Sequence, residues 1–108
     1  MSKEGVYTAR KRETIAEVPN LRVRILELDK GQCVPWHYHN QITDRFFCME
    51  GPMQVLTRNP DTSTVLEPGG TYAVAAGVAH YVSGVDHRPC KFMIVQGVGE
   101  YDYIPAED

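Results

Sequence analysis

The sequence predicts an all-β domain that is folded as a sandwich or a small barrel. From Leu21 onward it consists of short segments rich in Val, Ile, Thr, Tyr and Phe, each closed by Gly, Pro, Asn or Asp, which is the pattern of strands and turns. No segment has the period of a long amphipathic helix. Because closing a sheet removes exposed strand edges, so many short strands favour a sandwich or barrel.

The expected strands follow one another along the chain with tight turns between them. Strands are expected at residues 21–29, 33–39, 43–50, 52–58, 62–66, 71–76, 79–84 and 90–98. The turns at 29–31, 40–41, 51–52, 59–61, 68–70, 77 and 86–89 contain Gly, Pro, Asn or Asp, which favour turns. Residues 1–20 are expected to form an arm or an edge strand. Residues 99–108 either fold back over the barrel mouth or fray.

Length and charge restrict the function classes. With 108 residues, 43% of them hydrophobic, the chain is expected to form one domain. Its net charge of -3 offers no overall positive field for nucleic acid. No segment approaches the ~20 apolar residues needed to span a membrane, and the N-terminus lacks an apolar signal core, so we expect a cytoplasmic protein.

The three cysteines predict neither a disulfide scaffold nor a thiolate zinc site. Cys33, Cys48 and Cys90 are odd in number, widely spaced and without a C-x-x-C pair. We interpret them as small buried hydrophobic residues rather than redox groups.

Three histidines and one aspartate form the candidate site. His37 and His39 lie two residues apart in an extended segment, so strand alternation places both imidazoles on one face. Asp44 begins the next strand, across a turn, and can approach that pair. His80 lies in a distant apolar run, where a buried imidazole is costly without a partner.

Three imidazoles and a carboxylate suit one divalent first-row metal such as Fe, Mn, Ni, Cu or Zn. Four protein ligands would leave two positions of a six-coordinate ion for water or substrate, which is an open, catalytic arrangement. A lone H-x-H pair is weak evidence, since two hydrogen-bonded barrel histidines would give the same pattern, but the wider spacing strengthens the interpretation.

That wider spacing resembles the two motifs of the cupin superfamily. The chain contains Gly31-x5-His37-x-His39-x4-Asp44-x6-Gly51 and then Gly69-x5-Ala75-x-Gly77-x2-His80-x3-Gly84. The resemblance covers residues 21–98 and implies a single-domain jelly-roll barrel, the double-stranded β-helix, with 1–20 and 99–108 as its flanking segments. It also implies that His37, His39, Asp44 and His80 are the metal ligands.

Three positions depart from the family pattern. Asp44 replaces the usual Glu and is one methylene shorter, so it either ligates the metal or orients a histidine or a bound water. Ala75 stands in place of the usual Pro, and Gly84 in place of a frequent Asn. Both positions serve turn geometry in the family, so these changes leave the metal chemistry untouched.

Strand alternation predicts a largely apolar cavity and an aromatic outer surface. The side chains expected to point inward are Phe46, Cys48, Val78 and Val82, together with either Cys90, Phe92, Ile94 and Gln96 or the alternate residues of that strand. Such a lining suits a small, partly hydrophobic organic molecule rather than a sugar phosphate, because the nearest basic candidates, Arg45 and Arg58, are expected to face solvent or an interface. Outward Trp36, Tyr38, Phe47 and Met49 favour a homodimer.

Two functions remain open at this stage. The first is a metal-dependent enzyme acting on a small organic substrate, with dioxygenase-like chemistry by analogy, although the fold also hosts isomerases, lyases and binders. The second is a metal-containing binding or sensor module without turnover. A third hypothesis is a structural barrel that binds metal only adventitiously.

Overall fold

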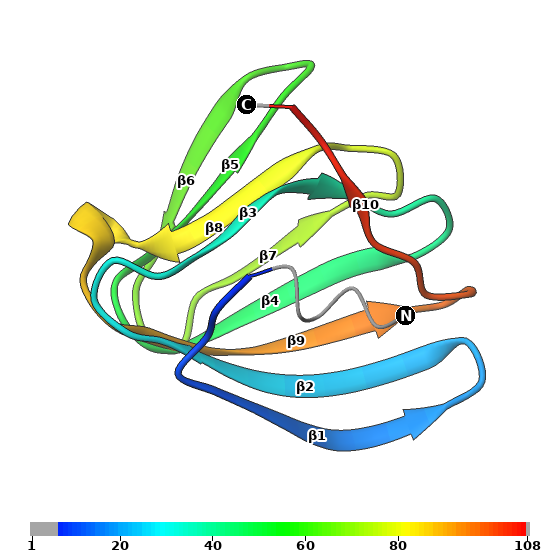
Figure 1. Cartoon of the computed structure of the whole chain (residues 1–108), viewed down its shortest axis with the longest axis horizontal. Coiled ribbons are helices and arrows are strands. Elements are labelled where there is room, and N and C mark those ends of the chain that lie inside the picture. Colours follow the sequence, from blue (N-terminus) through cyan, green and yellow to red (C-terminus); the bar gives the residue numbers. More distant parts are fainter. Residues whose placement is uncertain (1–6, 108) are drawn as a thin grey trace.

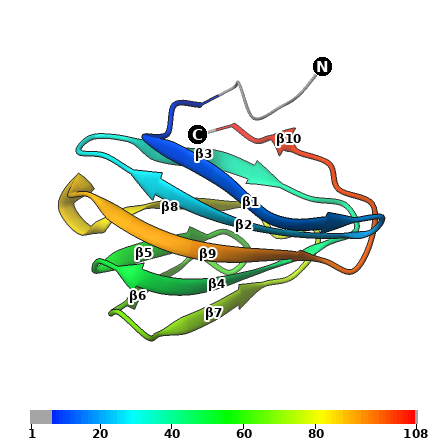
Figure 2. The same cartoon turned by 90° about the horizontal axis from the view of Figure 1, so that it is seen from below.

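Two antiparallel sheets of five strands each face one another in the computed structural model, which describes residues 7–107 (Figures 1 and 2). The first sheet has the order β1 (Lys11–Val18), β2 (Leu21–Leu28), β9 (Cys90–Gly97), β4 (Thr43–Glu50), β7 (Thr71–Val74). The second has the order β10 (Ile104–Pro105), β3 (Cys33–Tyr38), β8 (His80–Gly84), β5 (Met53–Thr57), β6 (Thr62–Leu66). The predicted all-β jelly-roll barrel is confirmed, and the eight expected strands lie within two residues of their predicted ends.

The core fills the space between the sheets with side chains at alternate strand positions. The largest buried apolar residues include Phe46 and Phe92 from the first sheet and Met53 from the second. Cys48 and Cys90 are buried among them and Cys33 is half-buried, and all three are free thiols. Cys48 and Cys90 therefore act as small buried hydrophobic residues, as predicted, whereas Cys33 is only partly buried.

The inner face of the first sheet changes from polar to apolar along its strands. Because β9 pairs with both β2 and β4, its inward side chains form cross-strand rows with theirs. Successive rows contain Arg22, Gln96 and Asp44, then Arg24, Ile94 and Phe46, then Leu26, Phe92 and Cys48. The inner face of the sheet therefore has polar side chains at one end of the barrel and apolar side chains at the other.

A bulge in β3 turns the histidines into the barrel. The register against β8 shifts between Val34 and His37, which pair with Val82 and His80. Without the extra residue, alternation from buried Val34 would point Trp36 inward. Pro35 occupies the bulge, where its missing N–H is not needed by the ladder. Trp36 instead packs outside on Tyr81, 5.9 Å between ring centroids.

The segments at both ends of the described chain add to the two sheets. β1 is an edge strand beside β2, with Ile15 51% and Val18 58% exposed. β10 pairs with the end of β3, so the C-terminal segment crosses from the first sheet to the second (Figure 1). Among residues 7–107 no helix is long and apolar enough to cross a bilayer.

The chain folds back tightly against Gly84, one of the positions that depart from the family pattern. A Cβ atom at Gly84 would lie 1.7 Å from the carbonyl oxygen of Arg88. No side chain fits at that separation, so the loop after β8 requires glycine here.

We predict that Gly84→Ala lowers the free energy of unfolding by about 1–3 kcal/mol, because the loop must move to admit the methyl group. Urea denaturation of both proteins measures the difference, with Ser63→Ala at an exposed strand position as the control. Equal midpoints for native protein and Gly84→Ala would contradict this account of the loop.

Candidate metal centre

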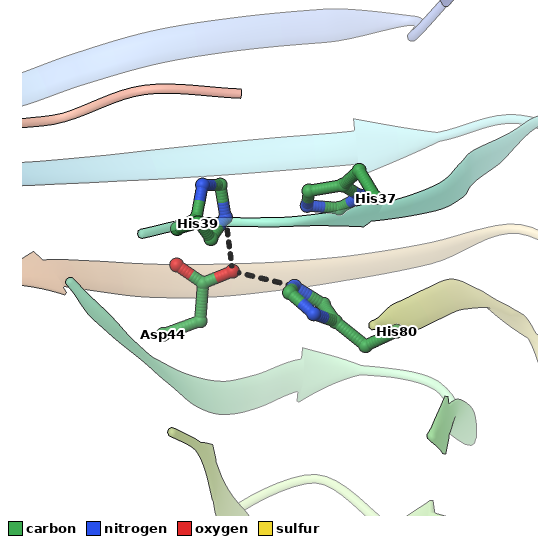
Figure 3. Close-up of side chains that lie close together, drawn as sticks. All are labelled: His37, His39, Asp44 and His80. Atoms are coloured by element: carbon green, nitrogen blue, oxygen red, sulfur yellow. Dashed lines mark hydrogen bonds and ion pairs between the residues drawn. The ribbon is translucent and has the colours of Figure 1, made fainter. Parts of the chain in front are cut away.

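Four buried side chains from three strands and one loop end converge at the polar end of the barrel. His37 lies in β3, His39 directly follows it, Asp44 lies in β4 and His80 begins β8. Their candidate ligand atoms all lie within 4.8 Å of one another, and each residue is at most 3% exposed. Figure 3 shows the four side chains pointing toward one another. The structure thus brings together all four residues that the sequence singled out.

Each of the three imidazoles is held through its Nδ1 atom by a backbone carbonyl. His37 Nδ1 lies 2.8 Å from the Pro35 oxygen, and His80 Nδ1 lies 2.9 Å from the Val78 oxygen. His39 Nδ1 lies 2.5 Å from the oxygen of Asp102. Because a carbonyl only accepts, Nδ1 carries the proton in all three rings and Nε2 is directed into the site.

This arrangement fits a transition metal. Metal-bound histidines commonly donate their second ring N–H to a carbonyl or carboxylate, which fixes the tautomer and the ring orientation. Three Nε2 atoms and a carboxylate without a thiolate suit Fe, Mn, Ni, Cu or Zn. The group formed by His37, His39, Asp44 and His80 could therefore hold one such ion.

Asp44 lies between two of the imidazoles and a supporting amide. Its Oδ2 atom lies 3.0 Å from His39 Nε2 and 2.8 Å from His80 Nε2 (Figure 3). Its Oδ1 atom accepts a hydrogen bond of 3.1 Å from Gln96 Nε2, and Gln96 Oε1 accepts one of 3.1 Å from Arg22 Nε. A metal ion bound by these atoms would replace the contacts between the carboxylate and the two Nε2 atoms.

The pKa values of His37 and His39 are shifted in opposite directions. Burial, and next the nearby His80 ring, lower the pKa of His37 to about 3, so this ring is neutral. Burial also lowers the pKa of His39, but the hydrogen bond and charge of Asp44 outweigh it and the net pKa is raised. Burial raises the pKa of Asp44, yet the bonds from His39 and His80 hold it far below its ordinary value.

Hydrogen bonds at two places hold together segments of the site that are distant in sequence. Asn40 donates from its backbone N to Asp102 Oδ1 at 3.0 Å and from its side chain to Oδ2 at 2.6 Å. These bonds hold the Asp102 carbonyl against His39. The N–H of Gly77 donates to the His39 carbonyl at 2.7 Å, and its φ of 83° needs glycine. The turn before His80 is thereby tied to His39.

The cavity beside the site is more polar than the sequence predicted. Its apolar lining includes Phe46, Val82, Phe92 and Ile94, as expected, but not Cys48, Val78 or Cys90. The expectation that no basic residue points inward is wrong, because Arg22 and Arg24 of β2 also line the cavity. The sequence does indicate these two arginines, because Leu26 and Leu28 are buried and period-two alternation places both arginines on the same face of the strand.

Three tyrosines complete the lining, two of them from the C-terminal segment. The ring of Tyr103 stacks on His37, with centroids 4.4 Å apart and an interplanar angle of 12°, and on Tyr7 at 6.1 Å. Tyr101 lies 5.5 Å from the His39 ring and beneath the guanidinium of Arg22, 3.6 Å away. No pattern in the sequence indicated whether the C-terminal segment packs on the histidines in this way or frays.

Comparison with known families matches the cupin domain over residues 24–96. No curated protein sequence matches the chain. Among solved structures, a cupin-2 domain containing protein of Shewanella frigidimarina is 24% identical, with 88% of each chain covered and a TM-score of 0.68.

Two other solved structures share the fold at lower identity. A double-stranded β-helix protein of Klebsiella pneumoniae is 19% identical over 100% of this chain and 97% of its own, with a TM-score of 0.78. A DMSP lyase structure is 17% identical over 99% of this chain and 60% of its own, with a TM-score of 0.77. At these identities the similarity shows the fold alone.

The shifted pKa values link folding stability to pH in the metal-free protein. Because the folded pKa of His39 lies above 6.5, its contribution is fully present below pH 6.5 and is lost as the pH rises through that pKa. The pKa of His37 is lowered, so the contribution of His37 to folding stability is lost as the pH falls from 6.5 toward about 3. The Asp44 contribution is lost at still lower pH.

We therefore predict that the free energy of unfolding of metal-free protein decreases from pH 6.5 to 8.5, by up to about 1.4 kcal/mol per pH unit for one proton. Asp44→Asn should flatten this slope, because it removes the charge that raises the pKa of His39. Urea denaturation in a chelator across this range measures both slopes. The same downward slope in native protein and Asp44→Asn would contradict the assignment.

Proposed function

This chain belongs to the cupin family, and we propose that it is a metal-dependent enzyme acting on a small organic substrate. The observation that supports this most strongly is the orientation of the three Nε2 atoms, each set by an Nδ1 hydrogen bond to the backbone. When bound, a divalent ion would act as a Lewis acid toward a substrate oxygen.

In this proposal His37, His39 and His80 hold the ion, and Asp44 completes the ligand set through Oδ2. Gln96 restrains the other carboxylate oxygen, which keeps Oδ2 directed at the imidazoles. The alternative role for Asp44 is to orient His39 and His80 without touching the ion, since aspartate is shorter than the usual glutamate. Four protein ligands would leave coordination positions open toward the cavity.

The proposed reaction class is dioxygenase-like. The proposal rests on the open, imidazole-rich ligand set, which suits metals that bind oxygenated substrates. A lyase reaction is another possibility for this site, because a DMSP lyase structure has the same fold. Fold alone does not choose between them, because one barrel supports several reactions.

A non-catalytic binding or sensor module is the second candidate function. It is favoured by the shortage of proton acceptors: Asp44 is the one carboxylate among the described residues that line the cavity. Burial raises the pKa of Tyr101 and of Tyr103, so neither phenol is a base near neutral pH. Turnover of a bound substrate would favour the enzyme, whereas binding without turnover would favour the module.

We also propose that the chain forms a homodimer. Met49 is 43% exposed on the outer side of β4, beside half-buried Phe47. Trp36 and Tyr38 lie on the outer side of β3, although Trp36 already packs on Tyr81 and under the guanidinium of Arg58.

The test is metal analysis of protein purified without a histidine tag and reconstituted separately with Fe, Mn, Ni, Cu and Zn. We expect about one equivalent in native protein and its loss in His80→Ala, because this change removes one of the three Nε2 ligands. His87→Ala is the matched control, since His87 is the exposed fourth histidine. Asp44→Asn should lower the metal affinity if Asp44 is a ligand.

Two results would contradict the proposal. Native protein that takes up none of the five metals would leave a metal-free barrel. Equal loss of metal from His80→Ala and His87→Ala would show adventitious binding. Full retention by Asp44→Asn would assign Asp44 the orienting role and leave the three histidines as the site.

A further inference from the structure

The candidate metal centre is closed to solvent. Each of its four residues is at most 3% exposed, and the free space in the cavity beside them is about 20 Å³. This is room for roughly one water molecule. A hydrated metal ion or an organic substrate is larger than that, so neither reaches the site unless part of the barrel moves.

Residues 101–107, here called the covering segment, close the cavity. Figure 1 shows the chain leaving β9 and crossing to β3 along this part of its length. Tyr101 and Tyr103 line the cavity, and their rings lie against His39 and His37 with centroids 5.5 and 4.4 Å apart. Two of the three imidazoles therefore lie under the covering segment.

Few backbone hydrogen bonds hold the covering segment. β10 has two residues and pairs with the last two residues of β3, and the N–H of Ala106 donates to the Trp36 carbonyl at 2.9 Å. β9, by contrast, pairs along eight residues with β2 and also with β4. Local opening costs less where fewer bonds must break, so we expect the covering segment to open before the strands beneath it.

The buried Tyr103 hydroxyl makes the closed state less favourable. This side chain is 3% exposed, and its hydroxyl has no hydrogen-bond partner within the part of the chain that the structure describes. A buried hydroxyl without a partner costs free energy, and opening would let water bind to it.

The covering segment also completes one of the candidate ligands. The Asp102 carbonyl holds His39 Nδ1, and the Asp102 carboxylate accepts two exposed hydrogen bonds from Asn40. If the segment moves away, His39 loses the acceptor that fixes its tautomer and ring orientation. His37 and His80 keep their acceptors, which lie outside the segment.

We propose that residues 101–107 are a lid, which opens to admit the metal ion and the substrate and completes the site when it closes. Its start is fixed, because the N–H of Gly99 donates to the Asn20 carbonyl at 2.9 Å and that of Glu100 to Gln41 Oε1 at 3.1 Å. A lid that strengthens metal binding is itself stabilised by bound metal, since coupling is reciprocal. The inference rests on the proposed function in taking the four residues as a metal site.

Amide hydrogen exchange of metal-free and zinc-loaded protein tests the opening. In metal-free protein we expect the amides of residues 101–107 to exchange at least tenfold faster than those of β9. Zinc should slow the exchange of the lid severalfold, because the closed lid holds His39 in its ligating orientation.

Transfer of zinc from loaded protein to an excess of chelator tests the link to the site. Asn40→Ala removes the side-chain bond to the Asp102 carboxylate, so it should speed both zinc transfer and lid exchange about fivefold. Gln54→Ala removes an amide hydrogen bond to Ser83, outside the lid and the site, and is the matched control with native rates.

A disulfide between the lid and β3 provides the opposite change. Ile104 and Tyr38 are partners in the β10–β3 ladder. The double variant Tyr38→Cys and Ile104→Cys, with its disulfide verified by mass spectrometry, should transfer zinc at least tenfold more slowly than native protein, because the lid cannot leave the cavity.

The outcomes separate the lid from the proposed function. Lid amides that exchange as slowly as those of β9 in metal-free protein, or zinc transfer at the native rate in the disulfide-linked variant, would overturn the lid even in protein that binds zinc. Fast exchange of the lid, raised further in Asn40→Ala, in protein that takes up no metal would support a mobile lid while the proposed metalloenzyme fails.

Discussion

Three hydrogen bonds from imidazole Nδ1 atoms to backbone carbonyls are the constraint on which the site depends. They place the ring protons on the outer side of His37, His39 and His80 and leave Nε2 facing inward. Two of the acceptors, Pro35 and Val78, lie two residues before the histidine they hold, so those ring orientations are set locally. The third acceptor, Asp102, is 63 residues from His39, and therefore the complete site needs the C-terminal segment in place.

The barrel positions this chemistry by separating polar and apolar rows between the same two sheets. Arg22, Gln96 and Asp44 lie in one cross-strand row. The next row still contains Arg24, and the row of Leu26 and Phe92 after it is apolar. Burial in that setting makes each polar group costly unless it has a partner. The hydrogen bonds from Arg22 to Gln96 and from Gln96 to Asp44 provide such partners, and they connect the lining of the cavity with the candidate metal centre.

The sequence predicted the parts of the structure that follow from local periodicity. Segments rich in β-forming residues and closed by turn residues predicted the strands, and the spacing of His37, His39, Asp44 and His80 predicted the site. Pairings between distant segments could not be read in this way. Gln96 was expected to point inward, but its bond to Asp44 depends on the register of β9 against β4. The role of Asp102 depends on a two-residue strand too short to have a period. The inward arginines were not predicted, although period-two alternation from Leu26 indicates them, because the prediction rested on Arg45 and Arg58 alone.

The central claim is that three Nε2 atoms jointly face one ion, and X-ray absorption spectroscopy of zinc-loaded protein tests it most directly. The account predicts three imidazole nitrogens at about 2.0–2.1 Å from zinc, with only oxygen in the remaining positions. Fewer than three imidazoles, or a sulfur ligand from any of the three cysteines, would contradict it.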